Sequence, residues 1–179
     1  MSDQEKEYET LKDQLRNGCI CSAWGDSYLF SVNPAPGIDR VRLSLVKKNT
    51  GGKESNDFYM KISDFRRLCE DIDSGLAWKR ISADKEKYPS AYKFVTGENG
   101  SKVLTLGGSR KNGYARVQIT IENSFMVSPV SGAELREMSF LFKLVMGLIP
   151  CSRYYKSLID VFWEGINERE EKAAKYKNH

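Results

Sequence analysis

A run of eight residues alternates side chains that suit a protein core with side chains that suit a nucleic acid. Because successive side chains of a β-strand point to opposite faces, the run predicts a strand with one apolar and one polar face. Tyrosine rings stack on bases and arginine pairs with phosphates, so nucleic acid is the leading candidate ligand. The apolar set is Ala115, Val117, Ile119 and Ile121, and the polar set is Tyr114, Arg116, Gln118 and Thr120.

A glycine-rich loop with two cations precedes this strand. It runs from Gly107 to Gly113 and carries Arg110 and Lys111 near its tip. The two side chains suit a clamp for a backbone phosphate, and the alternative is a solvated hairpin tip. The loop lacks the Gly-Lys-Ser/Thr ending of a nucleotide-binding P-loop, which excludes that kind of site.

Two earlier segments alternate in the same way. Arg40 and Arg42 alternate with apolar residues, and so do Tyr59 and Lys61. Each stack of a base on a ring contributes roughly 1–3 kcal/mol. The alternative is a solvated strand face, where a cross-strand pair of tyrosine and arginine contributes only a few tenths of a kcal/mol. The candidate nucleic-acid-binding residues are Arg40, Arg42, Lys48, Tyr59, Lys61, Arg110, Lys111, Tyr114, Arg116 and Gln118.

The charge of the chain is unevenly distributed. The formal net charge is +4, which divides into −4 over residues 1–39, +8 over residues 40–116 and zero over residues 117–179. A local basic surface is typical of proteins that bind polyanions. Lysines that keep strand edges soluble are the alternative explanation of the central excess.

Residues for covalent or metal chemistry are scarce. The only histidine is His179, and the chain has four cysteines. Cys19 and Cys21 are too close in sequence for a tetrahedral zinc knuckle, and four cysteines in 179 residues do not suggest a disulfide framework. No nucleophile elbow is present, and no base accompanies the thiols. We therefore expect a protein that is not an enzyme and that uses no metal or cofactor.

The sequence also bears on membranes and location. No apolar run approaches the roughly 20 residues that span a bilayer. Residues 1–16 are polar and charged, unlike a secretory signal or a lipid anchor. We expect no membrane partner and a cytoplasmic location.

The first half of the chain predicts strands followed by a helix. The helix is predicted to begin with Ser63 as its N-cap and to end at Gly75. Phe65, Leu68 and their neighbours at helical spacing form its buried stripe. Residues 1–18 suit a polar helix or a disordered segment. The predicted strands are 28–32, 39–48 and 56–62, with turns at 33–37 and 49–52.

The second half repeats this order. Its closing helix begins with a capping box of Ser131 and Glu134, carries an apolar stripe as far as Ile149 and ends at Pro150. One further helix follows, and its charged end is expected to fray from Asn167. The predicted strands are 91–96, 101–106, 114–121 and 124–128, with a two-residue Asn-Gly turn after Glu98.

A polar connector, residues 77–90, joins the two halves. Its Trp78-Lys79-Arg80 suits either a stacked base or, as is more common for a lone tryptophan, a small apolar cluster. Strand runs that are each closed by a helix predict an antiparallel α+β fold. This fold has two tandem antiparallel strand blocks, each closed by a helix, plus a C-terminal helix. The expected division is a polar N-terminal segment 1–22, a single domain 23–166 with halves 26–76 and 91–150, and a charged tail 167–179.

This order of elements resembles the Whirly family of plant single-stranded-DNA-binding proteins and, more distantly, the positive-cofactor-four coactivators. The resemblance is carried by the strand Gly113 to Asn123, the segment Phe125 to Val130 and the helix Ala133 to Ile149. Ile62 to Leu68 resembles the shorter helix that closes the first half. The resemblance covers about residues 26–150, and the lysine- and alanine-rich segment of plant Whirly proteins is absent.

The resemblance implies binding of single strands, DNA in the first place, with little sequence preference. It also implies a homo-oligomer whose apolar helices pack together and a role as an accessory of transcription or replication. The alternative function is a protein-interaction or homo-oligomeric scaffold module without nucleic-acid activity. In that case the apolar helices would contact another chain, and the basic strands would attract an acidic partner.

Overall fold

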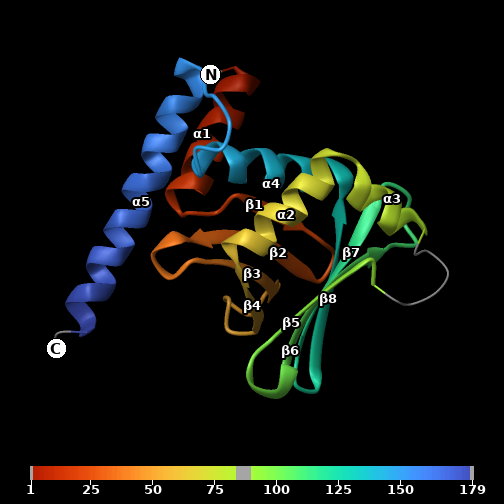
Figure 1. The fold of residues 1–179 in the computed structure, drawn as a ribbon. Coiled ribbons are helices and arrows are strands. Elements are labelled where there is room, and N and C mark those ends of the chain that lie inside the picture. Colours follow the sequence, from red (N-terminus) through yellow and green to blue (C-terminus); the bar gives the residue numbers. More distant parts are fainter. Residues whose placement is uncertain (1, 84–89, 178–179) are drawn as a thin grey trace.

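The computed structural model describes residues 2–83 and 90–177 of the chain. Their strands form two four-stranded antiparallel sheets in which each strand pairs with the next along the chain (Figure 1). Each sheet is followed by a helix that closes it, and a long helix ends the chain. The predicted α+β class, with two tandem strand blocks and a C-terminal helix, is therefore confirmed.

The elements follow each other in a simple order. Helix α1 is Asp3–Arg16. Sheet 1 consists of β1 (Cys21–Trp24), β2 (Tyr28–Ala35), β3 (Arg40–Lys47) and β4 (Ser55–Lys61), and the helices α2 (Ile62–Asp73) and α3 (Leu76–Ala83) follow it. Sheet 2 consists of β5 (Tyr92–Thr96), β6 (Lys102–Gly108), β7 (Tyr114–Ile121) and β8 (Ser124–Ser131). The helices α4 (Gly132–Val145) and α5 (Arg153–Lys177) complete the chain, with short 3₁₀ turns η1 (Pro36–Ile38) and η2 (Glu98–Gly100) in two hairpins.

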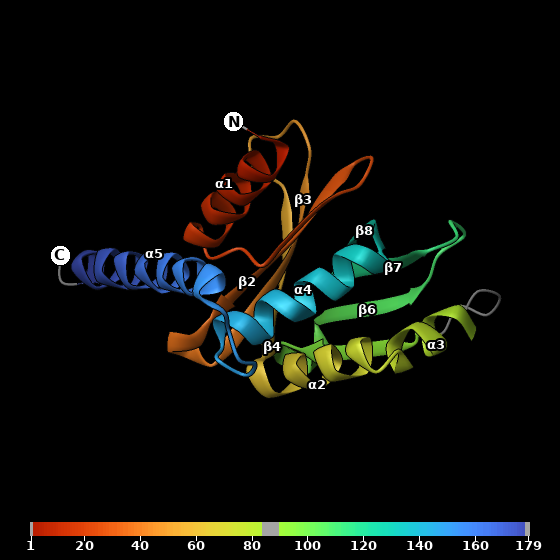
Figure 2. The same ribbon diagram turned by 90° about the horizontal axis from the view of Figure 1, so that it is seen from above.

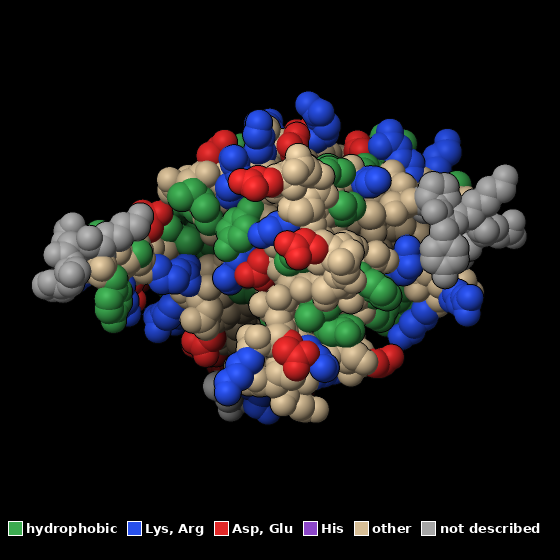
Figure 3. Space-filling model, turned by 90° about the horizontal axis from the view of Figure 1, so that it is seen from below, with side chains coloured by type: hydrophobic (Ala, Val, Ile, Leu, Met, Phe, Trp, Pro, Cys, Tyr) green, Lys and Arg blue, Asp and Glu red, His purple; other side chains and the backbone are tan. Residues whose placement is uncertain are grey.

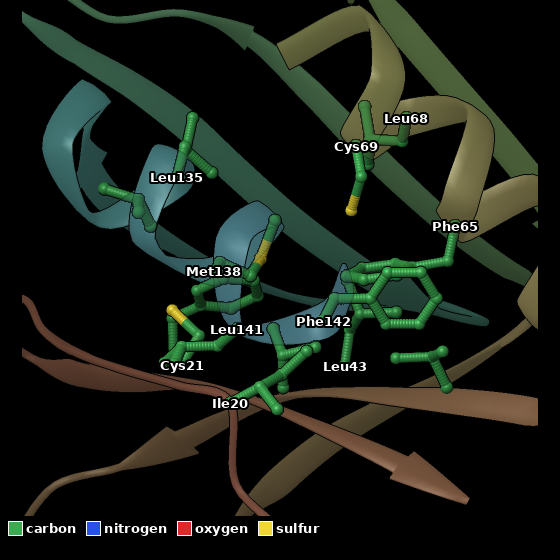
Figure 4. Packing of buried hydrophobic residues seen from close by; sticks show 14 of the residues in the cluster. Ile20, Cys21, Leu43, Phe65, Leu68, Cys69, Leu135, Met138, Leu141 and Phe142 are labelled. Carbon is green, nitrogen blue, oxygen red and sulfur yellow. The ribbon is translucent and has the colours of Figure 1, made fainter. Parts of the chain in front are cut away.

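Helices α2 and α4 lie together over the sheets and form the centre of the core (Figure 2). The rings of Phe65 on α2 and Phe142 on α4 meet edge to face, with centroids 4.9 Å apart. The Ser139 hydroxyl of α4 donates a hydrogen bond to the Cys69 carbonyl of α2 at 3.2 Å. Figure 4 shows these apolar side chains converging above Ile20 and the start of β1. The core therefore contains residues from both halves of the chain.

The terminal helices α1 and α5 pack against each other. Leu15 of α1 and Leu158 and Phe162 of α5 are fully buried. Gly165 marks the closest approach, because a Cβ atom there would lie 2.0 Å from the Arg16 carbonyl oxygen. The Trp163 indole donates to the Val145 carbonyl at 3.0 Å and so attaches α5 to the end of α4.

Two strands continue through prolines beyond their predicted ends. Strand β2 continues through Pro34, and β8 continues through Pro129. Neither proline interrupts a ladder, since β1 pairs no further along β2 than Val32 and β8 is an edge strand. A proline on the unpaired side of a strand costs no ladder hydrogen bond. The prediction that the turn 33–37 ends this strand is therefore wrong.

The helix ends differ in part from the prediction. The capping box of α4 is confirmed, because Ser131 N–H donates to Glu134 Oε2 and Glu134 N–H donates to Ser131 Oγ. Helix α4 ends at Val145 rather than Ile149, since Gly147 has a φ of 67° and a Schellman pair of hydrogen bonds closes the helix before Pro150. Helix α2 begins at Ile62 without a side-chain cap, so Ser63 is not its N-cap.

Other parts of the chain were expected to be irregular but are ordered. Residues 77–83, assigned to the connector, belong to α3, and residues 167–177, expected to fray, continue α5. Strand β1 was not predicted. The β5–β6 connection is also longer than the two residues expected, because Thr96 pairs with Lys102. Gly97, Asn99 and Gly100 supply its positive φ values, 81°, 52° and 71°.

Candidate nucleic-acid interface

The outer face of sheet 1 brings four candidate residues together. Strands β3 and β4 pair so that Arg42 lies opposite Tyr59 and Arg40 lies opposite Lys61. Their intervening neighbours, such as Val41 and Met60, point to the other side of the sheet and are buried. The alternation predicted for these strands thus places two arginines of β3 beside a tyrosine and a lysine of β4. We use the name outer face of sheet 1 for the side that carries these four residues, with Trp24, Ser44 and Asp57.

Trp24 is a member of this face that sequence reasoning missed. The register connects Trp24 to Leu29 and Leu29 to Val46, which places the indole on the same side as Arg42. The side chain is 68% exposed, and the Lys48 ammonium lies 5.5 Å from the centroid of its ring. The alternation from Cys21 to Trp24, which precedes a Gly-Asp turn, covers only four residues and is too short to identify a strand from the sequence.

The middle of this face is polar. Ser44 lies between Ser31 and Asp57 across the strands and is only 3% exposed. Its hydroxyl has no hydrogen-bond partner among the described residues. Arg40 contacts Asp39, donating to its carbonyl at 2.9 Å, with the carboxylate 3.8 Å away. The face therefore offers several cations, with the carboxylate of Asp57 among them, while the Ser44 hydroxyl is buried between the strands.

The other candidates follow β7 of sheet 2. As predicted, Ala115, Val117 and Ile119 are buried, while Tyr114, Arg116 and Gln118 lie on the opposite, partly exposed side. The Lys111 ammonium lies 3.9 Å from the centroid of the Tyr114 ring. The Gln118 amide donates to the Thr120 hydroxyl at 3.1 Å, so these two polar side chains of β7 are hydrogen-bonded to each other. Arg110 is exposed on the loop before the strand.

Apolar side chains share this second face. Val95 is 55% exposed and Phe125 is 64% exposed, and the register places them in one row with Val103 and Thr120. The sequence of β7 alone did not reveal these neighbours, because they come from β5, β6 and β8. The outer face of sheet 2 is therefore partly cationic and partly apolar.

The ten candidate residues divide between the two sheets. Arg40, Arg42, Lys48, Tyr59 and Lys61 belong to the region of sheet 1, and the other five belong to β7 and the loop before it. Seen from below, Lys and Arg side chains are spread over the surface with Asp and Glu among them (Figure 3). The excess positive charge of residues 40–116 is thus distributed over several elements.

Trp78 and Arg80 have structural partners. Trp78 is half-buried and its ring lies next to Gly132, where a Cβ atom would be 3.4 Å from the indole. Arg80 lies 3.3 Å from the Asp71 carboxylate and over the ring of Tyr92. These contacts attach α3 to its neighbours and favour the interpretation of Trp78 as the anchor of a cluster.

Burial favours the neutral form of three cysteine thiols, those of Cys19, Cys21 and Cys69. Burial raises the pKa of Cys69 to about 12, and it also raises the pKa values of Cys19 and Cys21. A thiol is a weak nucleophile until it loses its proton. In the described part of the chain, no three His, Cys, Asp or Glu side chains are grouped in a way that could hold a metal ion.

No helix within residues 2–83 and 90–177 combines the length and the apolar character needed to cross a membrane. Comparison of the chain with models of protein families, with curated proteins and with solved structures found no match. The resemblance to the Whirly family therefore remains a prediction from the order of the elements.

Proposed function

We propose that this protein binds single-stranded nucleic acid, DNA in the first place and with little sequence preference, on the outer face of sheet 1. The observation that carries the proposal is the register that places Arg42 beside Tyr59 and Arg40 beside Lys61. At the opposite end of the same face, Trp24 and Lys48 form a second pair of ring and cation. From the spacing of strands and residues, the two ends lie roughly 20 Å apart.

The mechanism involves no covalent step. Bases stack on Trp24 and Tyr59, and phosphates pair with the cations beside these rings. A single strand is flexible enough to follow such a face, and stacking tolerates any base because every base has a π-face. Release of counterions makes the binding weaken as salt is added.

The exposed tryptophan gives a direct test. Trp24 is exposed, whereas Trp78 and Trp163 are half-buried. We expect a single-stranded oligonucleotide to quench the tryptophan fluorescence at low salt, with an affinity that falls steeply as salt is raised. The variant W24A should lose the quenching. Absence of oligonucleotide binding at low salt would contradict the proposal.

Variants in each of the two sheets distinguish binding on the outer face of sheet 1 from binding on the outer face of sheet 2. R42Q with Y59A should weaken binding by roughly 5- to 150-fold if one stacked base is lost. The matched control is R110Q with K111Q, which removes two exposed cations from the loop before β7. An equal loss from both double variants would mean that no particular face binds the strand.

A second candidate function is favoured by the apolar row on sheet 2. Val95 and Phe125 give that face a character suited to a protein partner, either another protein or a second copy of this chain. Native mass measurement and oligonucleotide titration distinguish the two functions. A stable oligomer that does not bind oligonucleotides, and that is lost in the variant F125D, would support the function as an interaction module.

A further inference from the structure

A cavity of about 640 Å³ opens at one end of the outer face of sheet 1. Arg42 and Tyr59 form its side toward the sheet, and the turn η1 forms a second side. The third side is the C-terminal half of α5, from which Ile166, Arg169 and Ala173 line the space. Figure 1 shows this part of α5 descending beside the β2–β3 turn. The volume lies in the range of small-molecule sites, about 300–1,000 Å³.

Two cations face this cavity from different elements. Arg42 belongs to β3 and Arg169 to α5, and no ion pair among the described residues joins either guanidinium to a carboxylate. The Arg169 guanidinium also donates a hydrogen bond to the Arg16 carbonyl at 3.5 Å. Burial, and to a smaller extent the charge of Arg42, lowers the pKa of Arg169. Like charges that share a partly buried space repel each other, so an anion between them is favoured.

The remaining walls suit a flat ring. Tyr59 is 39% exposed, and Pro34 and Pro36 add apolar surface to the lining. Glu170 lies over the turn, because a Cβ atom on Gly37 would be 2.4 Å from its carboxylate oxygen. A carboxylate there can accept hydrogen bonds from an amino group or a sugar hydroxyl. The cavity thus combines a cationic end, an aromatic wall and an acceptor.

We propose that this cavity binds one nucleoside monophosphate unit, with its phosphate between Arg42 and Arg169 and its base against Tyr59. The unit has two sources, the phosphorylated end of a strand that lies on the outer face of sheet 1 and a free mononucleotide. The inference deepens the proposed function, because Arg42 and Tyr59 belong to both sites, whereas Arg169 belongs to the cavity alone.

The first experiment titrates the full chain with AMP, with adenosine and with inorganic phosphate by calorimetry. AMP is expected to bind at least ten times more tightly than adenosine. R169Q should reduce the affinity for AMP at least tenfold, and R169K should restore part of it. The matched control is K172Q, on an exposed residue of α5 outside the cavity lining. Equal affinities for AMP and adenosine, or equal effects of R169Q and K172Q, would overturn the inference.

A second experiment needs no variant and so does not depend on the stability of R169Q. Oligonucleotides of one sequence, with and without a phosphate at either end, are titrated under the same salt. A terminal phosphate that tightens binding severalfold identifies the strand end as the occupant, and AMP binding without this gain identifies the free mononucleotide. If neither effect appears while the unphosphorylated strand binds, the inference fails and the proposed function stands. If AMP binds and no oligonucleotide does, the proposed function fails alone.

Discussion

At the scale of residues, one polar cluster joins three elements of the fold. The Tyr92 hydroxyl of β5 donates to the Asp71 carboxylate of α2 at 2.7 Å, and Arg80 of α3 contacts the same carboxylate. Burial, and next the bond to Asp71, raises the pKa of Tyr92 to about 12. The sequence could not predict this cluster, because its members are distant in the chain and α3 was expected to be a connector.

The cluster predicts how stability depends on alkaline pH. The pKa of Tyr92 is higher in the folded protein than the value of about 10 expected when it is unfolded, so the folded state favours the proton. This contribution is complete below about pH 10 and is lost as the pH rises towards 12. Y92F should lower the free energy of unfolding by about 1 kcal/mol at neutral pH. Between neutral and alkaline pH, Y92F should lose less stability than the wild type.

Urea unfolding at pH 7 and pH 11 measures both effects. Y114F is the matched control, because the Tyr114 ring lies under Lys111 on an outer face and makes no contact with Asp71. If Y92F and the wild type lose the same stability between these two values of pH, the Tyr92 hydroxyl does not supply the alkaline dependence.

At the scale of elements, periodic patterns predicted most of what the structure contains. The alternation in β3, β4 and β7 and the capping box of α4 each extend over enough residues to identify the element and its buried side. Strand β1 has only four residues, and α3 has only eight, directly after Gly75. Such short elements show too few periods to be recognised. Their positions are determined by packing, as the buried Ala77 and Ile81 of α3 indicate.

The contact between α1 and α5 predicts a sensitive position at Gly165. A Cβ atom there would overlap the Arg16 carbonyl, which is backbone and cannot swing aside. G165L should therefore push α1 away and cost about 1–3 kcal/mol of stability, as overpacking usually does. Hydrogen exchange is expected to speed up in α1 more than in α4.

The neighbouring exposed residue provides the control for Gly165. E164L adds a similar side chain one position away, on the exposed side of α5, and should leave exchange in α1 unchanged. Equal protection of α1 in G165L and E164L would mean that the close approach of the two helices does not hold α1 in place.

At the scale of the whole molecule, the sequence predicted two blocks but not how they combine. The group of Arg40, Arg42, Tyr59 and Lys61 could be anticipated, because its members come from one hairpin. Trp24 and the cavity beside α5 could not, since they depend on an unpredicted strand and on the position of α5 beside the turn η1. Charge totals likewise gave the excess of cations in the central segment but not the faces that carry it.

A hydrogen bond between the two sheets allows a test of whether they unfold together. The buried Asn56 amide of β4 donates to the Ile119 carbonyl of β7 at 3.1 Å. Removing it leaves a buried acceptor with one partner fewer, so N56A should lower the free energy of unfolding by about 1–3 kcal/mol. The transition should remain single, because Phe65 and Phe142 still join the halves. The control S55A changes the exposed neighbouring residue and should leave the free energy of unfolding nearly unchanged. If N56A and S55A unfold at the same midpoint, the hydrogen bond of Asn56 does not stabilise the packing of the two sheets.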